Sequence, residues 1–141
     1  MSKTHTSIAT WSWRAAWEAS KDGRLVVQPV RISRGVPKFW PAAETFPEIP
    51  ELAPDGPMFS MTAERFEVAY RAKLDRLGVD LIQARLDATE AETDRGLALC
   101  CFEADRQRCH RGTWAWWWLE QTGVEVRELT GPQLTIAEAG R

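Results

Sequence analysis

The chain has 141 residues, of which 44% are hydrophobic and 27% charged, and its formal net charge is −2. These totals are typical of one globular domain with a core of its own, and they exclude a disordered chain. The near-neutral charge gives no general reason to expect nucleic acid as a partner. Since the sequence has neither a membrane-spanning apolar run nor the pattern of a signal peptide, we expect a cytoplasmic protein whose three cysteines are reduced thiols.

The first part of the chain predicts a strand, a helix and a second strand. Residues 6–11 form a short candidate strand, and Ser12 is suited to cap a helix over residues 13–20. Residues 25–33 have the composition of the second strand. Pro29 in that strand has no amide donor, which predicts an edge position, a break or a bulge there.

A proline-rich connection follows. Residues 34–61 hold six of the eight prolines, which predicts extended and turn segments, and their aromatic side chains predict packing onto the rest of the domain. Thr62 is suited to cap a helix over residues 63–77. After Gly78, Asp80 is the residue we expect to cap the next helix.

The second half predicts a strand over residues 97–103, a helix over 109–122 and a last strand over 124–129. Strands that alternate with helices are typical of a three-layer α/β domain with a parallel sheet. We therefore expect a single domain over residues 1–141, with a small, largely parallel sheet flanked by helices. The proline-rich connection would be an insertion, and residues 130–141 a loose tail.

The stretch CCFEADRQRCHRGTWAWWWLE carries all three cysteines. Alternation along a strand places Cys101 and Glu103 on one face at the carboxyl end, where ligands bind in open α/β sheets. The next helix begins near Cys109, His110 and Arg111, and a thiol at a helix N-terminus beside basic groups has a lowered pKa. We interpret Cys109, His110 and Glu103 as candidate catalytic residues, and Arg111 and Cys101 as candidate substrate-binding residues.

A second polar cluster follows the second strand. Arg31, Ser33 and Arg34 are candidate anion contacts, and in a parallel sheet they would emerge at the same edge as the Cys-His-Arg turn. The two clusters together predict a small anionic ligand, phosphorylated or nucleotide-like. The alternative is that these residues are solvated loop charges.

A metal site is a further alternative. Cys101, Glu103, Cys109 and His110 offer four potential ligands, but the spacing of the two cysteines is not the C-x2-C pair of zinc ribbons. We therefore expect no cofactor, with zinc as the less favoured reading.

Most of the neighbouring apolar side chains predict core. Cys100 lies on the opposite strand face from Cys101, and free cysteine is often buried. Trp114, Trp117 and Trp118 share one helix face, whereas Trp116 lies elsewhere. One tryptophan near the Cys-His-Arg end could instead form a stacking wall for a base or a sugar.

The residues also resemble a known family. The pattern of C-x-E, a short loop, C-H-R, a helix and G-V-E-V resembles the C-terminal signature of the domain of unknown function 488 family, and VRISRGVPKFWP is similar to its second-strand segment. The resemblance implies a small cytoplasmic α/β protein of bacteria, archaea or phages, with a signature that looks enzymatic and suggested nucleotide-related roles. Cys100 and the WAWWW run depart from the family pattern.

We therefore expect an enzyme, a transferase or a hydrolase, that acts on a small anionic substrate. One alternative is a binding module for nucleotides or nucleic acid that does not react, although the net charge does not imply nucleic acid. Another is a phage or host interaction protein whose contact surface is the proline-rich connection. The oligomeric state, the substrate and the pathway are not predicted.

Overall fold

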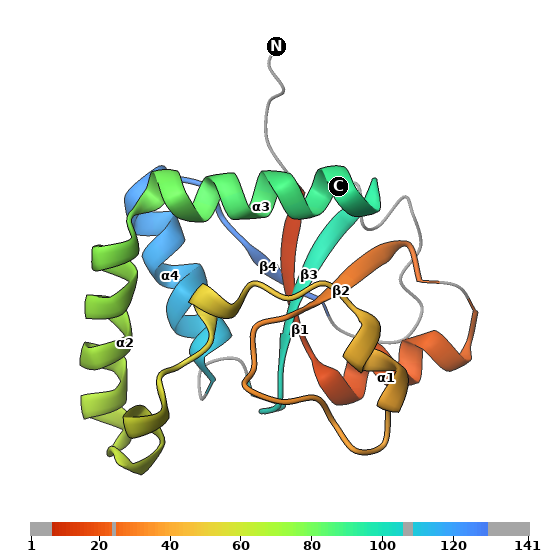
Figure 1. The fold of residues 1–141 in the computed structure, drawn as a ribbon, viewed down its shortest axis with the longest axis horizontal. Coiled ribbons are helices and arrows are strands. Elements are labelled where there is room, and N and C mark those ends of the chain that lie inside the picture. Colours follow the sequence, from red (N-terminus) through yellow and green to blue (C-terminus); the bar gives the residue numbers. More distant parts are fainter. Residues whose placement is uncertain (1–6, 24, 106–108, 130–141) are drawn as a thin grey trace.

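The computed structural model describes residues 7–23, 25–105 and 109–129 and has the expected α/β architecture (Figure 1). Its four strands form one sheet in the order β2-β3-β1-β4, and all three neighbouring pairs are parallel. The strands are β1 (Ile8–Ser12), β2 (Val27–Arg31), β3 (Gly96–Cys101) and β4 (Arg127–Glu128).

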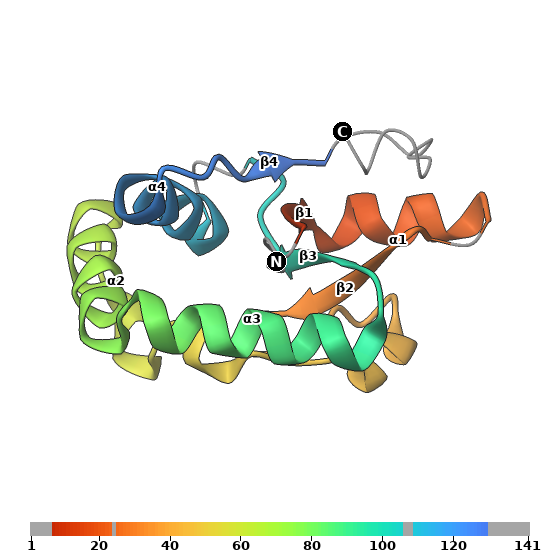
Figure 2. The same ribbon diagram turned by 90° about the horizontal axis from the view of Figure 1, so that it is seen from above.

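In the part of the chain that the structure describes, four α-helices connect these strands, together with three short 3₁₀ turns in the proline-rich connection. Helix α1 covers one side of the sheet, whereas α2 and α4 lie on the other (Figure 2). Within the described chain no helix is long and apolar enough to cross a membrane. The helices are α1 (Trp13–Lys21), α2 (Ala63–Leu77), α3 (Val79–Thr93) and α4 (His110–Thr122), and the turns are η1 (Pro41–Thr45), η2 (Pro50–Leu52) and η3 (Gly56–Ser60).

The core is divided in two by the sheet. Leu97 and Leu99 of β3 belong to a cluster with α2, α3 and α4, whereas Ala98 and Cys100 belong to a cluster with α1. This division confirms the strand alternation predicted for β3, since successive side chains point to opposite faces. It also gives the domain its three layers.

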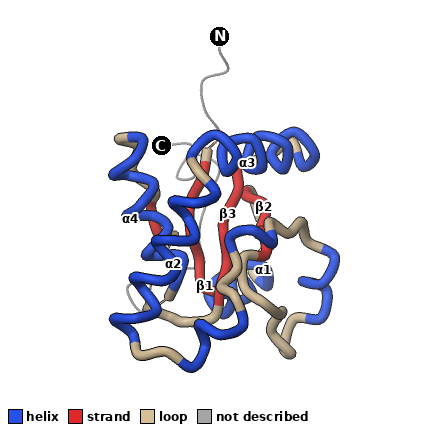
Figure 3. Tube along the Cα trace, turned by 60° about the vertical axis from the view of Figure 1, so that its left-hand side comes forward, coloured by secondary structure: helices blue, strands red, loops and turns tan. Residues whose placement is uncertain are grey.

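The connection between β2 and α2 is mostly loop and packs against the domain (Figure 3). Ile49, Leu52 and Met58 are buried in the larger core cluster, so the connection packs onto the domain. Of its aromatic side chains, on which that prediction was based, Trp40 and Phe46 pack against the smaller cluster, whereas Phe39 and Phe59 are exposed. Strand β2, which contains Pro29, lies at the edge of the sheet, where a missing amide donor is tolerated.

Two helix starts agree with the sequence and one does not. The hydroxyl oxygens of Ser12 and Thr62 accept hydrogen bonds from the amides of Ala15 and Arg65, as N-caps do. The expected cap at Asp80 is wrong, because α3 already begins at Val79. Gly78 has a φ of 84°, which only glycine adopts readily, and it ends α2 and starts α3 in a single residue.

The last two strands are shorter than predicted. Strand β3 ends at Cys101, two residues before Glu103, and β4 comprises Arg127 and Glu128 only. The tail predicted over residues 130–141 lies outside the described residues.

Candidate functional site

Three chain segments meet at the carboxyl edge of the sheet. The amide of Ile32, just after β2, donates to the carbonyl oxygen of Cys100 at the end of β3 (3.4 Å). The carbonyl oxygen of Ile32 in turn lies 2.6 Å from Nε2 of His110, the first residue of α4. The predicted convergence of the two polar clusters at one edge is therefore confirmed.

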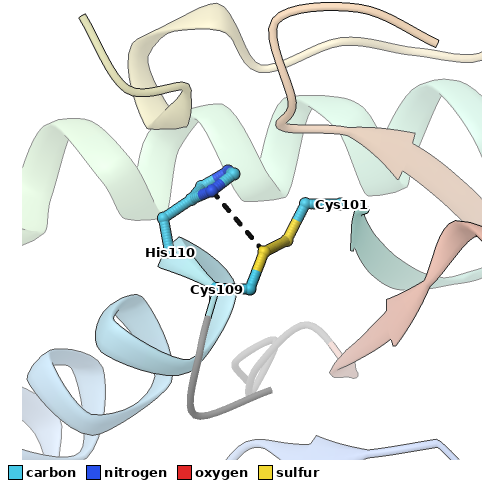
Figure 4. Close-up of side chains that lie close together, drawn as sticks. All are labelled: Cys101, Cys109 and His110. Carbon is cyan, nitrogen blue, oxygen red and sulfur yellow. Dashed lines mark hydrogen bonds between the residues drawn. A yellow bond between two sulfur atoms is a disulfide. The ribbon is translucent and has the colours of Figure 1, made fainter. Parts of the chain in front are cut away.

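The centre of this site is a disulfide bond. The sulfur of Cys101 at the end of β3 and the sulfur of Cys109 at the N-cap of α4 are bonded, at 2.08 Å (Figure 4). The expectation that all three cysteines are reduced thiols is therefore wrong for this pair. Only Cys100 is free, and it is fully buried, as predicted for a core residue; burial raises the pKa of its thiol.

His110 lies directly against this pair. Its Nε2 must donate to the carbonyl oxygen of Ile32, because a carbonyl oxygen only accepts, so Nδ1 carries the lone pair. That Nδ1 is 3.7 Å from the Cys109 sulfur and points toward it (Figure 4). Burial lowers the pKa of His110 to about 4, with the charge of Arg111 acting in the same direction and the Ile32 hydrogen bond opposing it. The imidazole is therefore neutral near pH 7.

Arg111 is fully buried, and each of its five N–H groups has a protein partner. Two of them form a fork onto the carboxylate of Glu128, at 3.0 and 2.7 Å. The other three reach the Cys101 sulfur and the backbone oxygens of Glu103 and Ala104, at 3.3, 2.7 and 3.2 Å. Arg111 was predicted to bind an anionic substrate, but its donors are all used by the protein itself. Its bonds to the backbone oxygens hold the chain segment just after β3 in place.

Glu128 is the partner that the sequence reasoning missed. It lies in the short edge strand β4, and its carboxylate accepts from Arg111 and from the hydroxyl of Thr10 (2.6 Å). The predicted strand over residues 124–129 carries two acidic residues, Glu125 and Glu128, and nothing in the sequence shows which of them meets Arg111. The pair brings β1, β4 and α4 together beside the disulfide.

Glu103 is not placed as the sequence predicted. Because β3 ends at Cys101, strand alternation does not extend to Glu103, whose side chain is exposed. Arg111 binds the backbone oxygen of this residue, and its carboxylate makes none of the described contacts with Cys109 or His110. The structure therefore separates it from the Cys-His pair.

The cluster after β2 is largely engaged with the protein. Ser33 accepts from the indole of Trp13 (3.0 Å) and donates to the carbonyl oxygen of Gly35 (2.5 Å). Arg31 donates to the carbonyl oxygen of Phe46 (3.0 Å) and forms an ion pair with Glu48. Arg34 is exposed, with its guanidinium 5.9 Å from the ring of Phe59.

The tryptophans of α4 serve the core. Trp114, Trp117 and Trp118 are buried, whereas Trp116 is 56% exposed, as the helical spacing predicted. The ring of Trp114 stacks on Trp118 and has no exposed surface. It therefore offers no face to a base or a sugar, so the predicted core role holds for Trp114 and the alternative of a stacking wall does not.

The site contains a set of metal-type donors. Within the described residues one group of three could hold an ion: Sγ of Cys101, Sγ of Cys109 and a ring nitrogen of His110, all within 4.8 Å of one another. Glu103, the fourth ligand considered from the sequence, is not in this group. Oxidation joins the two sulfurs, so the same atoms serve either a disulfide or a metal.

Comparison of the chain with protein-family models, with curated proteins and with solved structures finds no match. The resemblance to the domain of unknown function 488 family therefore stays a prediction.

Proposed function

We propose that the protein is a thiol–disulfide oxidoreductase in which Cys101 and Cys109 cycle between dithiol and disulfide. The observation that carries this proposal is the bonded sulfur pair with Nδ1 of His110 directed at the Cys109 sulfur. Buried structural cysteines are inert, whereas a pair beside a neutral base and a helix N-terminus is suited to reversible exchange. The reaction class therefore differs from the transferase or hydrolase expected from the sequence.

The two cysteines have different surroundings, which favours different roles. Cys109 is less buried than Cys101, stands at the N-cap position of α4 and lies beside the base, so it is the group that attacks the substrate. Cys101 is fully buried and accepts a hydrogen bond from Arg111, which stabilises its thiolate. Cys101 is therefore the resolving cysteine.

The exchange is balanced in electrons and protons. The Cys109 thiol gives its proton to Nδ1 of His110, and the thiolate attacks a substrate disulfide, so that a mixed disulfide forms and one substrate thiolate leaves. The first substrate thiolate takes the proton of the Cys101 thiol, and the Cys101 thiolate then attacks the Cys109 sulfur. The intramolecular bond forms, and the second substrate thiolate leaves and takes the proton held by His110. Two electrons pass to the substrate, and the two protons of the protein thiols end on the substrate thiols.

The substrate that fits best is a low-molecular-weight disulfide that carries carboxylates. Arg34 is exposed two residues after Ile32, whose carbonyl oxygen binds His110, so a cation lies on the chain segment next to the reactive pair. This choice keeps the anionic substrate expected from the sequence. Arg34 would favour other anions as well, so a nucleotide-like substrate stays a prediction.

The test uses the reduced full chain and oxidised glutathione, with the products followed by thiol-specific alkylation and mass spectrometry. We expect the Cys101–Cys109 disulfide in the wild type and in the matched control Cys100→Ala, since Cys100 lies on the other sheet face. Cys101→Ser should stop at a mixed disulfide on Cys109. His110→Gln should slow the reaction about 100-fold, as the loss of a general base does.

Far-UV circular dichroism of each variant separates loss of chemistry from loss of fold. A wild type that stays reduced in oxidised glutathione would overturn the proposal. So would a mixed disulfide that accumulates on Cys101 in folded Cys109→Ser at the wild-type rate, because the roles would then not follow from exposure and from His110.

A further inference from the structure

We infer that the reduced protein binds one zinc ion through the thiolates of Cys101 and Cys109 and Nδ1 of His110, and that oxidation of the two cysteines releases it. This inference goes beyond the proposed exchange reaction, since it assigns the same three side chains a ligand. The spacing of the two cysteines in the sequence did not favour a zinc site. The structure does favour one, because it brings the three donor atoms within 4.8 Å of one another.

His110 has the tautomer and the ring orientation of a metal ligand. Metal-binding histidines typically donate their second ring N–H to a carboxylate or a backbone carbonyl, which fixes the tautomer and the ring orientation. Nε2 of His110 makes such a bond to the carbonyl oxygen of Ile32 at 2.6 Å, and the residue is only 7% exposed. The lone pair of Nδ1 is thereby directed toward the two sulfurs, as Figure 4 shows.

The backbone separation leaves room for an ion between the sulfurs. The Cα atoms of Cys101 and Cys109 are 7.2 Å apart, which exceeds the roughly 4.4–6.8 Å usual for disulfides. In a tetrahedral zinc site with Zn–S bonds of about 2.3 Å, two sulfurs lie about 3.8 Å apart. Once the bond between them is reduced, side-chain rotation can therefore separate the sulfurs without drawing the two chain segments further apart.

Charge and donor type favour zinc over hard cations. Two thiolates and one neutral imidazole bring the charge of a divalent ion to zero, and the neighbouring Arg111 is neutralised by Glu128. A buried site without net charge avoids most of the desolvation cost of an ion. Thiolate and imidazole donors select Zn²⁺, whereas Ca²⁺ and Mg²⁺ require oxygen ligands.

The three protein ligands leave the fourth position of the ion to a water or to a substrate, as in catalytic zinc sites. Binding releases the two thiol protons. A substrate disulfide would release the ion again. The two cysteine thiolates form the intramolecular bond, the substrate disulfide becomes two thiolates, and Zn²⁺ is released.

The test titrates Zn²⁺ into the reduced, chelator-stripped full chain against a chromophoric chelator, and repeats the titration with Co²⁺ to record sulfur-to-cobalt charge-transfer absorption. We expect one ion per chain in the reduced wild type and in Cys100→Ala, and no binding after oxidation. Cys101→Ser, Cys109→Ser and His110→Ala should each lose more affinity than the roughly 10–100-fold that removing an outer-shell partner costs.

Absence of stoichiometric binding to the reduced protein would overturn the inference, as would equal binding after oxidation or loss of binding in folded Cys100→Ala. Its failure is distinguishable from that of the proposed function. A reduced protein that exchanges with glutathione but binds no zinc refutes only the zinc site. A protein that binds zinc but never forms the Cys101–Cys109 bond refutes the exchange function and the oxidative release, and leaves the zinc site of the reduced protein standing.

Discussion

Removing one partner of the buried pair of Arg111 and Glu128 should strongly destabilise the fold. The guanidinium of Arg111 is fully buried and the Glu128 side chain is 19% exposed. Replacing Glu128 by Gln keeps the size of the side chain but removes the charge, and an amide nitrogen then faces a guanidinium that has only donors. Removing one partner of a buried pair costs about 3–5 kcal/mol, and we expect the lower end because Gln still accepts one hydrogen bond.

The assay is urea unfolding followed by circular dichroism, with the free energy of unfolding extrapolated to water. The matched control is Glu120→Gln, which removes the same charge from the exposed pair that Glu120 forms with Arg71 (side chains 51% and 29% exposed). Exposed pairs contribute about 0–1 kcal/mol. The double variant Arg111→Met/Glu128→Leu should recover much of the lost stability, since apolar replacement of a buried pair is often neutral.

A difference below about 1 kcal/mol between Glu128→Gln and Glu120→Gln would refute the reasoning, because that is the range of an exposed pair. An unchanged m value is needed for the comparison, since a change in m indicates a change in the surface exposed on unfolding.

Two further predictions concern the proline-rich connection. Tyr70→Phe should lower the free energy of unfolding by about 1–3 kcal/mol in the same assay, because the buried phenol donates to the carbonyl oxygen of Leu52 (2.5 Å), which would lose its partner; an unchanged midpoint would contradict this. Burial raises the pKa of Glu51, but the hydrogen bond and the charge of Arg85 outweigh it and hold the pKa below its ordinary value of 4.5. The stabilisation that the Glu51–Arg85 pair contributes is complete above pH 4.5 and is lost as the pH falls through the lowered pKa of Glu51. Arg85→Gln should therefore lower the free energy of unfolding by up to about 1 kcal/mol at pH 7 and by less at pH 3. Urea unfolding at both pH values measures the difference.

Much of the fold follows from local signals in the sequence. The caps at Ser12 and Thr62 and the alternation of apolar residues in β3 each depend on a few neighbouring residues, and these were predicted. The edge position of Pro29 was one of three predicted alternatives. The start of α3 was not predicted, because the sequence does not show that Gly78 serves both helices. The boundary between α2 and α3 depends on the φ angle of this one residue.

The residues of the site could be predicted from the sequence, but their hydrogen-bond partners could not. Spacing correctly gathered Cys101, Cys109, His110 and Arg111 at one edge of the sheet. It could not assign their partners, because the carbonyl oxygen of Ile32 and the carboxylate of Glu128 lie 78 and 17 residues away along the chain. The sequence therefore predicted that Arg111 binds an anionic substrate and did not show that it pairs with Glu128.

The same Glu128→Gln variant should also shift the redox equilibrium of the disulfide. Glu128 neutralises Arg111, whose Nη1 donates to the Cys101 sulfur at 3.3 Å. Without the carboxylate the guanidinium charge acts unopposed on Cys101 and favours the thiolate, so the reduced form gains stability. A gain of about 1.4 kcal/mol makes the reduction potential about 30 mV more positive. Equilibration in glutathione buffers at pH 8 with alkylation of free thiols measures it, and Glu120→Gln should leave the potential unchanged. A shift to a more negative potential in Glu128→Gln would show that Arg111 mainly stabilises the disulfide form, contrary to the role given to its hydrogen bond.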